Sequence, residues 1–325
     1  MKPTFESSRT KSLVAVFCFA ISLFSNHAAH GQEKNRKKPK VVVNYRSPER
    51  AFEKVTIDDR VFIVEKQLLV EDSATARKAL ARLKFNIDLA LSILPPHSHE
   101  QVAKQQFWLL YGKKAKGGGR DSGLAYFRPG SPKFDANRHE EWNSVVVVYH
   151  ANNYVSLTDL WALKSVLHEL AHAYQLEQWP EKEPNIMAAY ENAMADGLYQ
   201  DVRNNKGGRF KPAYAASNQL EYFAEVSCMF FAKCNYEPFN RAELRQIDPS
   251  GYNMLRKVWK IGDAHGKHEE RVWKIGRSGR PVRGTLKSLA RKRVTLIDPD
   301  GQEKAYTLTA LSSVDRDYVK RWFEE

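Results

Sequence analysis

The sequence is poor in features that would crosslink the chain, carry it across a membrane or bind a phosphate. Only three of its 325 residues are cysteines and no Cys-x-x-Cys pair occurs, so cysteine alone does not supply a zinc site. The glycine run at residues 117–119 lacks a following Gly-Lys-Ser/Thr, which excludes a phosphate-binding loop there. Beyond residue 24, no apolar stretch is long enough to cross a bilayer. With 42% hydrophobic residues, the composition is that of a globular protein.

The first 31 residues have the pattern of a secretory signal peptide. A positive start precedes a short apolar stretch, and small residues stand at the spacing needed for cleavage: Lys2, Arg9 and Lys11, then Ser12–Phe24, then Ala29 and Gly31. We expect residues 1–31 to be removed and the mature protein, without a transmembrane span, to be periplasmic or extracellular. A retained anchor is the alternative. Cleavage lowers the net charge from +13 to +11, because the segment carries three basic side chains and one acidic one.

Two cysteines, Cys228 and Cys234, remain in the mature chain. Export to an oxidising compartment permits a disulfide between them. Six positions apart on one continuous helix is too far for a bridge, so a disulfide requires the helix to end between them. The sequence alone therefore does not decide between a disulfide and two free thiols.

The rest of the chain mixes strand-like and helix-like segments and predicts an α+β fold in two domains. Residues 32–59 are a basic linker with a first strand, residues 60–262 form the main domain, and residues 267–325 form a smaller one. Strands are expected at Val41–Tyr45, Arg60–Val70 and Ser144–Ala151, and helices over about 73–94, 156–179, 185–202, 218–232 and 248–261. Short strands, a tight Asp-Gly turn and a terminal helix predict a small β-barrel for the second domain.

The clearest chemical motif reads HELAH and covers residues 168–172 of one predicted helix. His168 and His172 stand four positions apart, so both imidazoles lie on one helix face and can reach one tetrahedral zinc ion. Glu169 points beside that position and can act as a general base on a water molecule. The alternative is a helix with two partly exposed histidines, but its apolar surroundings indicate a central helix. The β-branched run before it, Ser144–Ala151, is expected to bind a substrate backbone by edge pairing.

A catalytic zinc site needs a third protein ligand and an open fourth position. Gln178 stands where metzincins have a third histidine, so a carboxylate is expected instead. Three glutamates compete for this role. Glu191 lies nineteen residues after His172, and Glu221 and Glu225 lie one helical turn apart further along the chain.

The surroundings of Glu221 carry a second, longer pattern. Tyr214 stands seven residues before Glu221, Asn218 lies between them, and the sequence Tyr-Phe-Ala-Glu follows, ending at Glu225. This stretch resembles the zinc-ligand helix of the anthrax lethal factor peptidase family, a branch of the gluzincins. Together with HELAH, the resemblance spans about residues 144–232. The toxin-specific domains of that family have no counterpart here, so its substrate does not carry over.

The resemblance implies a zincin-like metallopeptidase domain with a zinc site, whose ligands are His168, His172 and Glu221. Glu169 is then the general base for the attacking water and later the proton donor to the leaving amine. Tyr214 donates a hydrogen bond to the oxyanion of the tetrahedral intermediate. Glu225 is expected to hold a ligand histidine through its other ring nitrogen, with a solvated or capping acid as the alternative.

The second domain resembles the first homology domain of the yeast endocytic adaptor Sla. The match is carried by Arg271, Trp273, Asp300, Gly301, Leu311, Ser312 and Asp315. The resemblance implies an SH3-like barrel with a tendency to bind short peptides, and the alternative is an appendage that serves stability or docking. Residues 267–325 carry a net charge of +5, with fourteen basic and nine acidic side chains, and show no nucleic-acid-binding pattern. The expected ligand is a short peptide or an anionic cell-surface polymer.

These observations predict an exported zinc-dependent peptidase that acts on a protein or peptide substrate. The alternative is a peptide-binding adaptor, in which the second domain binds the partner and the zincin-like domain is a scaffold. A third interpretation is hydrolysis of a non-peptide amide, such as a cell-wall crosslink.

Overall fold

The structure is a computed structural model, in which residues 43–130, 138–261, 270–276 and 278–323 are described. The expected signal peptide, residues 1–31, and the start of the basic linker lie outside these ranges. Within them, no helix combines the length and the apolar character that crossing a bilayer requires.

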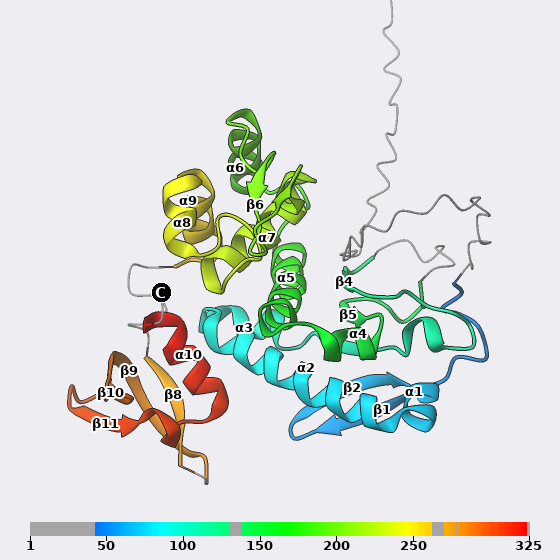
Figure 1. Ribbon diagram of the computed structural model, residues 1–325, viewed down its shortest axis with the longest axis horizontal. Helices are drawn as coiled ribbons and strands as arrows, with labels where there is room; N and C mark the ends of the chain where they lie inside the picture. The colour runs from blue at the N-terminus through cyan, green and yellow to red at the C-terminus, as the bar shows by residue number, and fades with distance from the viewer. Residues whose placement is uncertain (1–42, 131–137, 262–269, 277, 324–325) are drawn as a thin grey trace, which may run out of the picture.

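A five-stranded mixed sheet forms one side of the main domain (Figure 1). In spatial order its strands are β1 (Phe52–Ile57), β2 (Arg60–Glu65), β3 (Gln106–Leu109), β5 (Val145–Val148) and β4 (Leu124–Phe127). Strands β2, β3 and β5 run parallel, whereas β1 and β4 are antiparallel to their neighbours. Because β1 pairs with β2 over its full length, residues before position 60 contribute to this sheet.

Helices build the rest of the main domain, and some of them pack on this sheet (Figure 1). They are α1 (Lys66–Glu71), α2 (Ser73–Ile93), α3 (His99–Val102), α4 (Ala151–Ser156), α5 (Asp159–Gln178), α6 (Pro184–Ala195), α7 (Gln219–Phe231), α8 (Arg241–Ile247) and α9 (Pro249–Val258). The 3-10 turns η1 (Pro96–Ser98), η2 (Gly112–Lys114) and η3 (Tyr214–Ala216) and the small hairpin β6 (Val202–Arg203) and β7 (Arg209–Phe210) complete it. Helix α5 packs against α2, α7 and β4 and is buried throughout residues 162–175, so it is the central helix.

The expectation that Ser144–Ala151 supplies the edge strand is wrong. Strand β5 is flanked by β3 on one side and β4 on the other. All four of its valines are buried, as is usual for a strand covered on both faces. The strand at the edge beside α5 is β4, which is short and follows the glycine-rich loop.

Two other strand predictions are corrected. The described part of Val41–Tyr45 forms no strand, and Tyr45 is instead buried against Trp142, with ring centroids 4.8 Å apart. The run Arg60–Val70 is extended only through β2, after which α1 begins. Its β-branched residues are concentrated in the first half and its leucines in the second, which accounts for the change.

The second domain contains a four-stranded antiparallel sheet in the order β11-β10-β9-β8, and no closed barrel forms in the described residues. Its elements are β8 (Glu270–Ile275), β9 (Arg280–Ala290), β10 (Arg293–Ile297), β11 (Glu303–Thr307), η4 (Leu308–Ala310) and α10 (Ser313–Phe323). Trp273 packs edge-on against Tyr318 of α10, with centroids 5.6 Å apart, so α10 covers a face that barrel closure would otherwise bury. Helix α10 also packs on α2, which joins the two domains (Figure 1).

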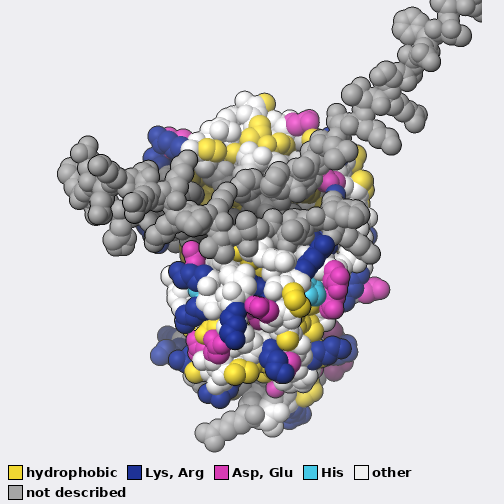
Figure 2. Space-filling view, turned by 90° about the vertical axis from the view of Figure 1, so that its right-hand side faces the viewer, with side chains coloured by type: hydrophobic (Ala, Val, Ile, Leu, Met, Phe, Trp, Pro, Cys, Tyr) yellow, Lys and Arg dark blue, Asp and Glu magenta, His cyan; other side chains and the backbone are white. Residues whose placement is uncertain are grey.

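The charged side chains of both signs are intermixed on the face of the molecule shown in Figure 2. Lysine and arginine side chains stand beside aspartate and glutamate there, with single hydrophobic side chains between them. On the coloured part of this face, the two signs of charge are therefore not separated into distinct patches (Figure 2).

Candidate metal centre

Helix α5 begins at a side-chain cap and ends just before a proline. The Thr158 hydroxyl oxygen accepts a hydrogen bond from the Trp161 N–H at 3.4 Å, and Pro180 follows the last turn. These two signals fix the helix around the HELAH motif. Packing of α5 against α2, α7 and β4 places His168 and His172 inside the protein, at 2% and 8% exposure.

Asn218 explains where helix α7 starts. Its side-chain oxygen accepts hydrogen bonds from the N–H groups of Leu220 and Glu221, at 2.9 and 3.0 Å. This cap sets the first turn of the helix, so Glu221 and, one turn later, Glu225 face the same side. That side is turned toward α5, and both carboxylates are buried.

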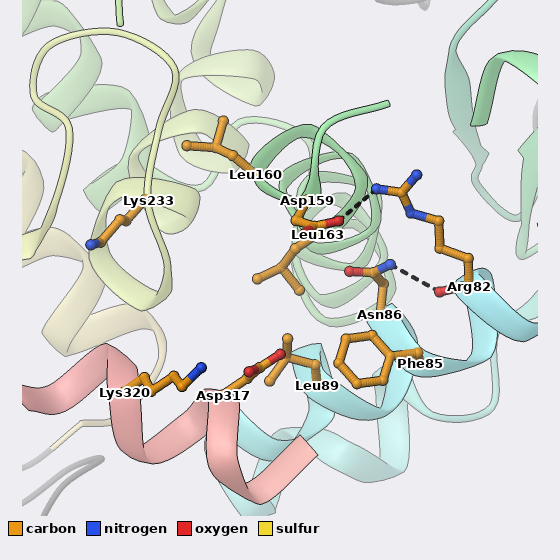
Figure 3. Close-up of a pocket in the computed structure, with 10 residues that line it drawn as sticks. All are labelled: Arg82, Phe85, Asn86, Leu89, Asp159, Leu160, Leu163, Lys233, Asp317 and Lys320. Carbon is orange, nitrogen blue, oxygen red and sulfur yellow. Dashed lines mark hydrogen bonds and ion pairs between the residues drawn. The ribbon is translucent and has the colours of Figure 1, made fainter. Parts of the chain in front are cut away.

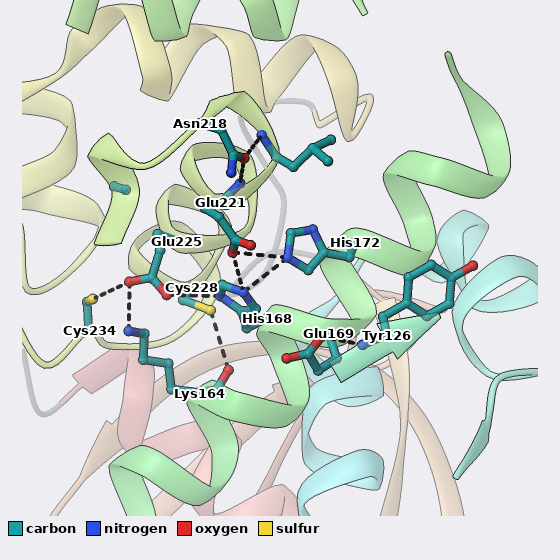
Figure 4. A network of polar contacts seen from close by, with 12 residues as sticks. Tyr126, Lys164, His168, Glu169, His172, Asn218, Glu221, Glu225, Cys228 and Cys234 are labelled. Carbon is teal, nitrogen blue, oxygen red and sulfur yellow. Dashed lines mark hydrogen bonds and ion pairs between the residues drawn. The ribbon is translucent and has the colours of Figure 1, made fainter. Parts of the chain in front are cut away.

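The two helices bring His168, His172 and Glu221 together as a buried group able to hold a metal ion (Figure 4). The Nε2 atoms of the two histidines lie 3.1 Å apart. A carboxylate oxygen of Glu221, Oε2, lies 3.0 Å from Nε2 of His168 and 3.3 Å from Nε2 of His172. The three donor atoms thus form a nearly equilateral triangle.

This triangle fits a small tetrahedral metal ion. Ligand bonds of about 2.0–2.2 Å at tetrahedral angles put neighbouring donor atoms about 3.3–3.6 Å apart, close to the separations found here. Two imidazoles and one carboxylate are also a donor set that suits zinc, with a fourth position left for water or substrate. The residues present therefore fit the metal that the HELAH motif predicts.

The competing ligand, Glu191, lies elsewhere. It is exposed on α6 and does not belong to the group formed by the two histidines. Among the three glutamates left open by the spacing argument, Glu221 is the one whose oxygen reaches both imidazoles. Glu225 reaches the other side of one imidazole instead.

Glu225 orients His168 from behind. Its Oε1 lies 2.9 Å from Nδ1 of His168, which leaves Nε2 directed at the metal position. Burial alone would raise the pKa of Glu225, but the Lys164 ammonium and His168 lower it to about 2. In contrast, Nδ1 of His172 is buried and has no hydrogen-bond partner among the described residues.

Glu169 is held beside the group by the edge strand. Its Oε2 accepts a hydrogen bond from the Tyr126 backbone N–H of β4 at 2.7 Å, and the side chain is only 3% exposed (Figure 4). Burial raises the pKa of Glu169, although the nearby histidines oppose the shift. A carboxylate of this kind is a stronger base than an exposed one.

Tyr214 lies on the turn η3 next to the same group. Its ring stacks on the His168 ring, with centroids 5.9 Å apart and an interplanar angle of 28°. Burial, together with the carboxylates of Glu221 and Glu169, raises the pKa of the phenol far above its usual value. A neutral phenol can donate a hydrogen bond through its hydroxyl.

Sequence reasoning missed three groups that support the centre. Lys164 is buried and donates to Glu225 and Asn235, at 2.7 Å each, and the backbone of Tyr126 holds Glu169. One signal was available, because Lys164 stands four positions before His168 in a largely apolar part of the helix. No local signal identifies Asn235 or the strand around Tyr126.

The two cysteines are free thiols. Helix α7 ends at Phe231, between Cys228 and Cys234, as a bridge would require, but no disulfide joins them. Both thiols are buried, and burial raises the pKa of Cys234 to about 12. Neither belongs to the metal-binding group.

A separate cleft of about 470 Å³ lies where α2, α5 and α10 meet (Figure 3). Its lining mixes apolar and charged side chains, namely Arg82, Phe85, Asn86, Leu89, Asp159, Leu160, Leu163, Lys233, Asp317 and Lys320. None of the residues of the metal-binding group lines it. The first turns of α5 therefore border one hollow, and its middle turns carry the candidate centre.

Comparison of the chain with protein-family models, with curated proteins and with solved structures finds no match. The functional assignment therefore depends on the residues and their geometry.

Proposed function

We propose that this protein is an exported zinc-dependent peptidase of the gluzincin type, with His168, His172 and Glu221 as metal ligands. The observation that carries the proposal is the joint presence of this buried donor group and a buried carboxylate, Glu169, hydrogen-bonded to an edge strand. A zincin fold for residues 60–262 agrees with the mixed sheet, its antiparallel edge strand β4 and the packing of β4 against the HELAH helix.

When bound, a zinc ion supplies a Lewis acid that polarises the scissile carbonyl and stabilises developing negative charge. Glu169 takes a proton from the attacking water and later delivers it to the leaving amine; its burial, by raising its pKa, suits it to this role. Tyr214 donates its phenolic hydrogen to the oxyanion of the tetrahedral intermediate.

Strand β4 is the proposed binding place for the substrate backbone. Within the described residues no strand pairs with its outer edge, so an extended peptide can add there as a further strand. Glu169 is hydrogen-bonded to Tyr126 of the same strand. A peptide paired with β4 therefore runs close to the general base.

The test is hydrolysis of a proteome-derived peptide library by the Glu169→Gln variant. The amide cannot accept the proton of water, so we expect cleavage to fall by about 10²–10⁴-fold while one zinc ion remains bound. Glu191→Gln, an identical change at an exposed position, is the matched control and is expected to cleave normally. Wild-type activity in Glu169→Gln would refute the mechanism.

A further inference from the structure

A buried lysine lies behind the candidate metal centre. Lys164 stands one turn before His168 on α5, and its side chain is 3% exposed. The ammonium donates to Oε2 of Glu225 at 2.7 Å (Figure 4). It also donates to Oδ1 of Asn235 at 2.7 Å. Two aromatic rings flank it, those of Trp161 and Tyr236, with centroids 5.0 and 5.1 Å from the ammonium nitrogen.

Glu225 connects this lysine to a metal ligand. One carboxylate oxygen contacts Nδ1 of His168 at 2.9 Å, and the other contacts Lys164. The Glu225 side chain is fully buried, and a carboxylate without water is costly unless a cation accompanies it. A metal-bound imidazole is neutral, so Lys164 is the contacting cation that balances Glu225 in the loaded centre.

We propose that Lys164 is a positioning residue for the metal centre, which acts through Glu225 to fix the ring of His168. This inference rests on the metal site of the proposed function. With both carboxylate oxygens engaged, Glu225 has one orientation, and His168 must present Nε2 toward His172 and Glu221. The lysine thereby orients a ligand without touching the ion.

The same cluster also reaches the turn that carries Tyr214. The hydroxyl oxygen of Tyr236, whose ring flanks Lys164, accepts a hydrogen bond from the Ala215 N–H at 3.1 Å. Ala215 is the neighbour of Tyr214 in η3. Lys164 thus contacts both Glu225, which holds His168, and Tyr236, which holds the turn that carries Tyr214.

The experiment measures zinc affinity of the full mature chain by competition with a chromophoric chelator. Lys164→Met keeps the length of the side chain and removes the charge, and we expect zinc binding to weaken by about 10–100-fold. Lys233→Met, the same change at an exposed lysine, is the matched control and is expected to bind zinc as the wild type does. The absorption spectrum of the Co²⁺-substituted protein should change in Lys164→Met alone, since it reports ligand orientation.

A double variant separates positioning from a general loss of structure. Lys164→Met/Glu225→Gln removes both charges and keeps an amide oxygen for the His168 N–H, so it should bind zinc about tenfold more tightly than Lys164→Met. If Lys164→Met does not fold, the double variant is compared with Glu225→Gln, which leaves the lysine charge uncompensated. The double variant is expected to bind zinc more tightly than Glu225→Gln.

Two results would overturn the inference. One is wild-type zinc affinity in Lys164→Met, and the other is a double variant that binds zinc no better than the single variant with which it is compared. Neither readout involves peptide cleavage. A chain that binds zinc but cleaves no peptide would refute the peptidase proposal and leave this inference intact.

Discussion

Helix α5 borders two polar regions that differ in how their charged side chains are stabilised. In the first turn of α5, Asp159 pairs with Arg82 at 2.8 Å, although the Asp159 carboxylate is fully exposed. Lys320 lines the cleft beside this pair, and no ion pair of Lys320 is seen among the described residues. In its middle turns, Lys164 and Glu225 are both buried and lie 2.7 Å apart. Water solvates the first set, whereas the second depends on its partners. Substitutions of similar chemistry should therefore have very different effects in the two regions.

The largest effect is expected from Glu221→Ala. Two histidines alone leave the proposed site one ligand short, so the purified variant should lose its stoichiometric zinc. Metal analysis after dialysis measures this. The control is Glu191→Ala, which removes an exposed carboxylate from α6 and should keep one zinc ion. Retention of zinc by Glu221→Ala and loss by Glu191→Ala would reverse the ligand assignment.

The next effect is on the rate of hydrolysis. Tyr214→Phe removes the proposed oxyanion donor and should lower kcat by about 10²–10³-fold, with little change in KM. Zinc content should be that of the wild type, because the proposed ligand group, His168, His172 and Glu221, is left intact. Tyr306→Phe, on β11 of the second domain, serves as the control. An unchanged kcat in Tyr214→Phe would exclude the residue from catalysis.

A smaller effect is expected in the cleft region. Arg82 donates to the Val155 carbonyl at 2.6 Å as well as to Asp159, so it ties α2 to the end of α4. Arg82→Met should reduce the free energy of unfolding by about 1 kcal/mol, seen as a fall of about 2–4 °C in Tm. Zinc affinity should not change. A weaker zinc affinity would show that the two regions along α5 are coupled.

The smallest effect is expected from Lys320→Ala. No ion pair of this side chain is seen among the described residues, and it is partly solvated at the rim of the cleft. The free energy of unfolding should change by less than about 0.5 kcal/mol in a denaturant titration. A loss several times larger would mean that the packing of α10 on α2 depends on this charge.

The two helices that carry the candidate centre could be predicted from the sequence, because the residue patterns that indicate them are short-range. The spacing of His168 and His172, the helix start near Asn218 and the repeat from Glu221 to Glu225 are each features of one or two helical turns. The gluzincin resemblance led us to expect that His168, His172 and Glu221 lie close together. Periodicity alone did not distinguish Glu221 from Glu191, since that choice depends on how distant helices pack.

The errors concern non-local pairing. A β-branched run predicts a strand, but its place in a sheet is decided by partners far away in the sequence. The run at β5 therefore does not reveal that β4 occupies the edge. The same reason applies to the second domain, where the expected short strands form an open four-stranded sheet, and α10 rather than barrel closure covers Trp273. Burial of Lys164 likewise depends on α7 and on Asn235.

The donor triangle also has a consequence for the stability of one segment. His172 and Glu221 are separated by 49 positions, and between them lie α6, the β6–β7 hairpin and η3. An ion bound by both residues would hold the two ends of this segment together. Metal binding would therefore oppose local unfolding of the segment by mass action. Amide hydrogen exchange between these two residues should accordingly slow when zinc is added, whereas exchange in the β8–β11 sheet should stay the same.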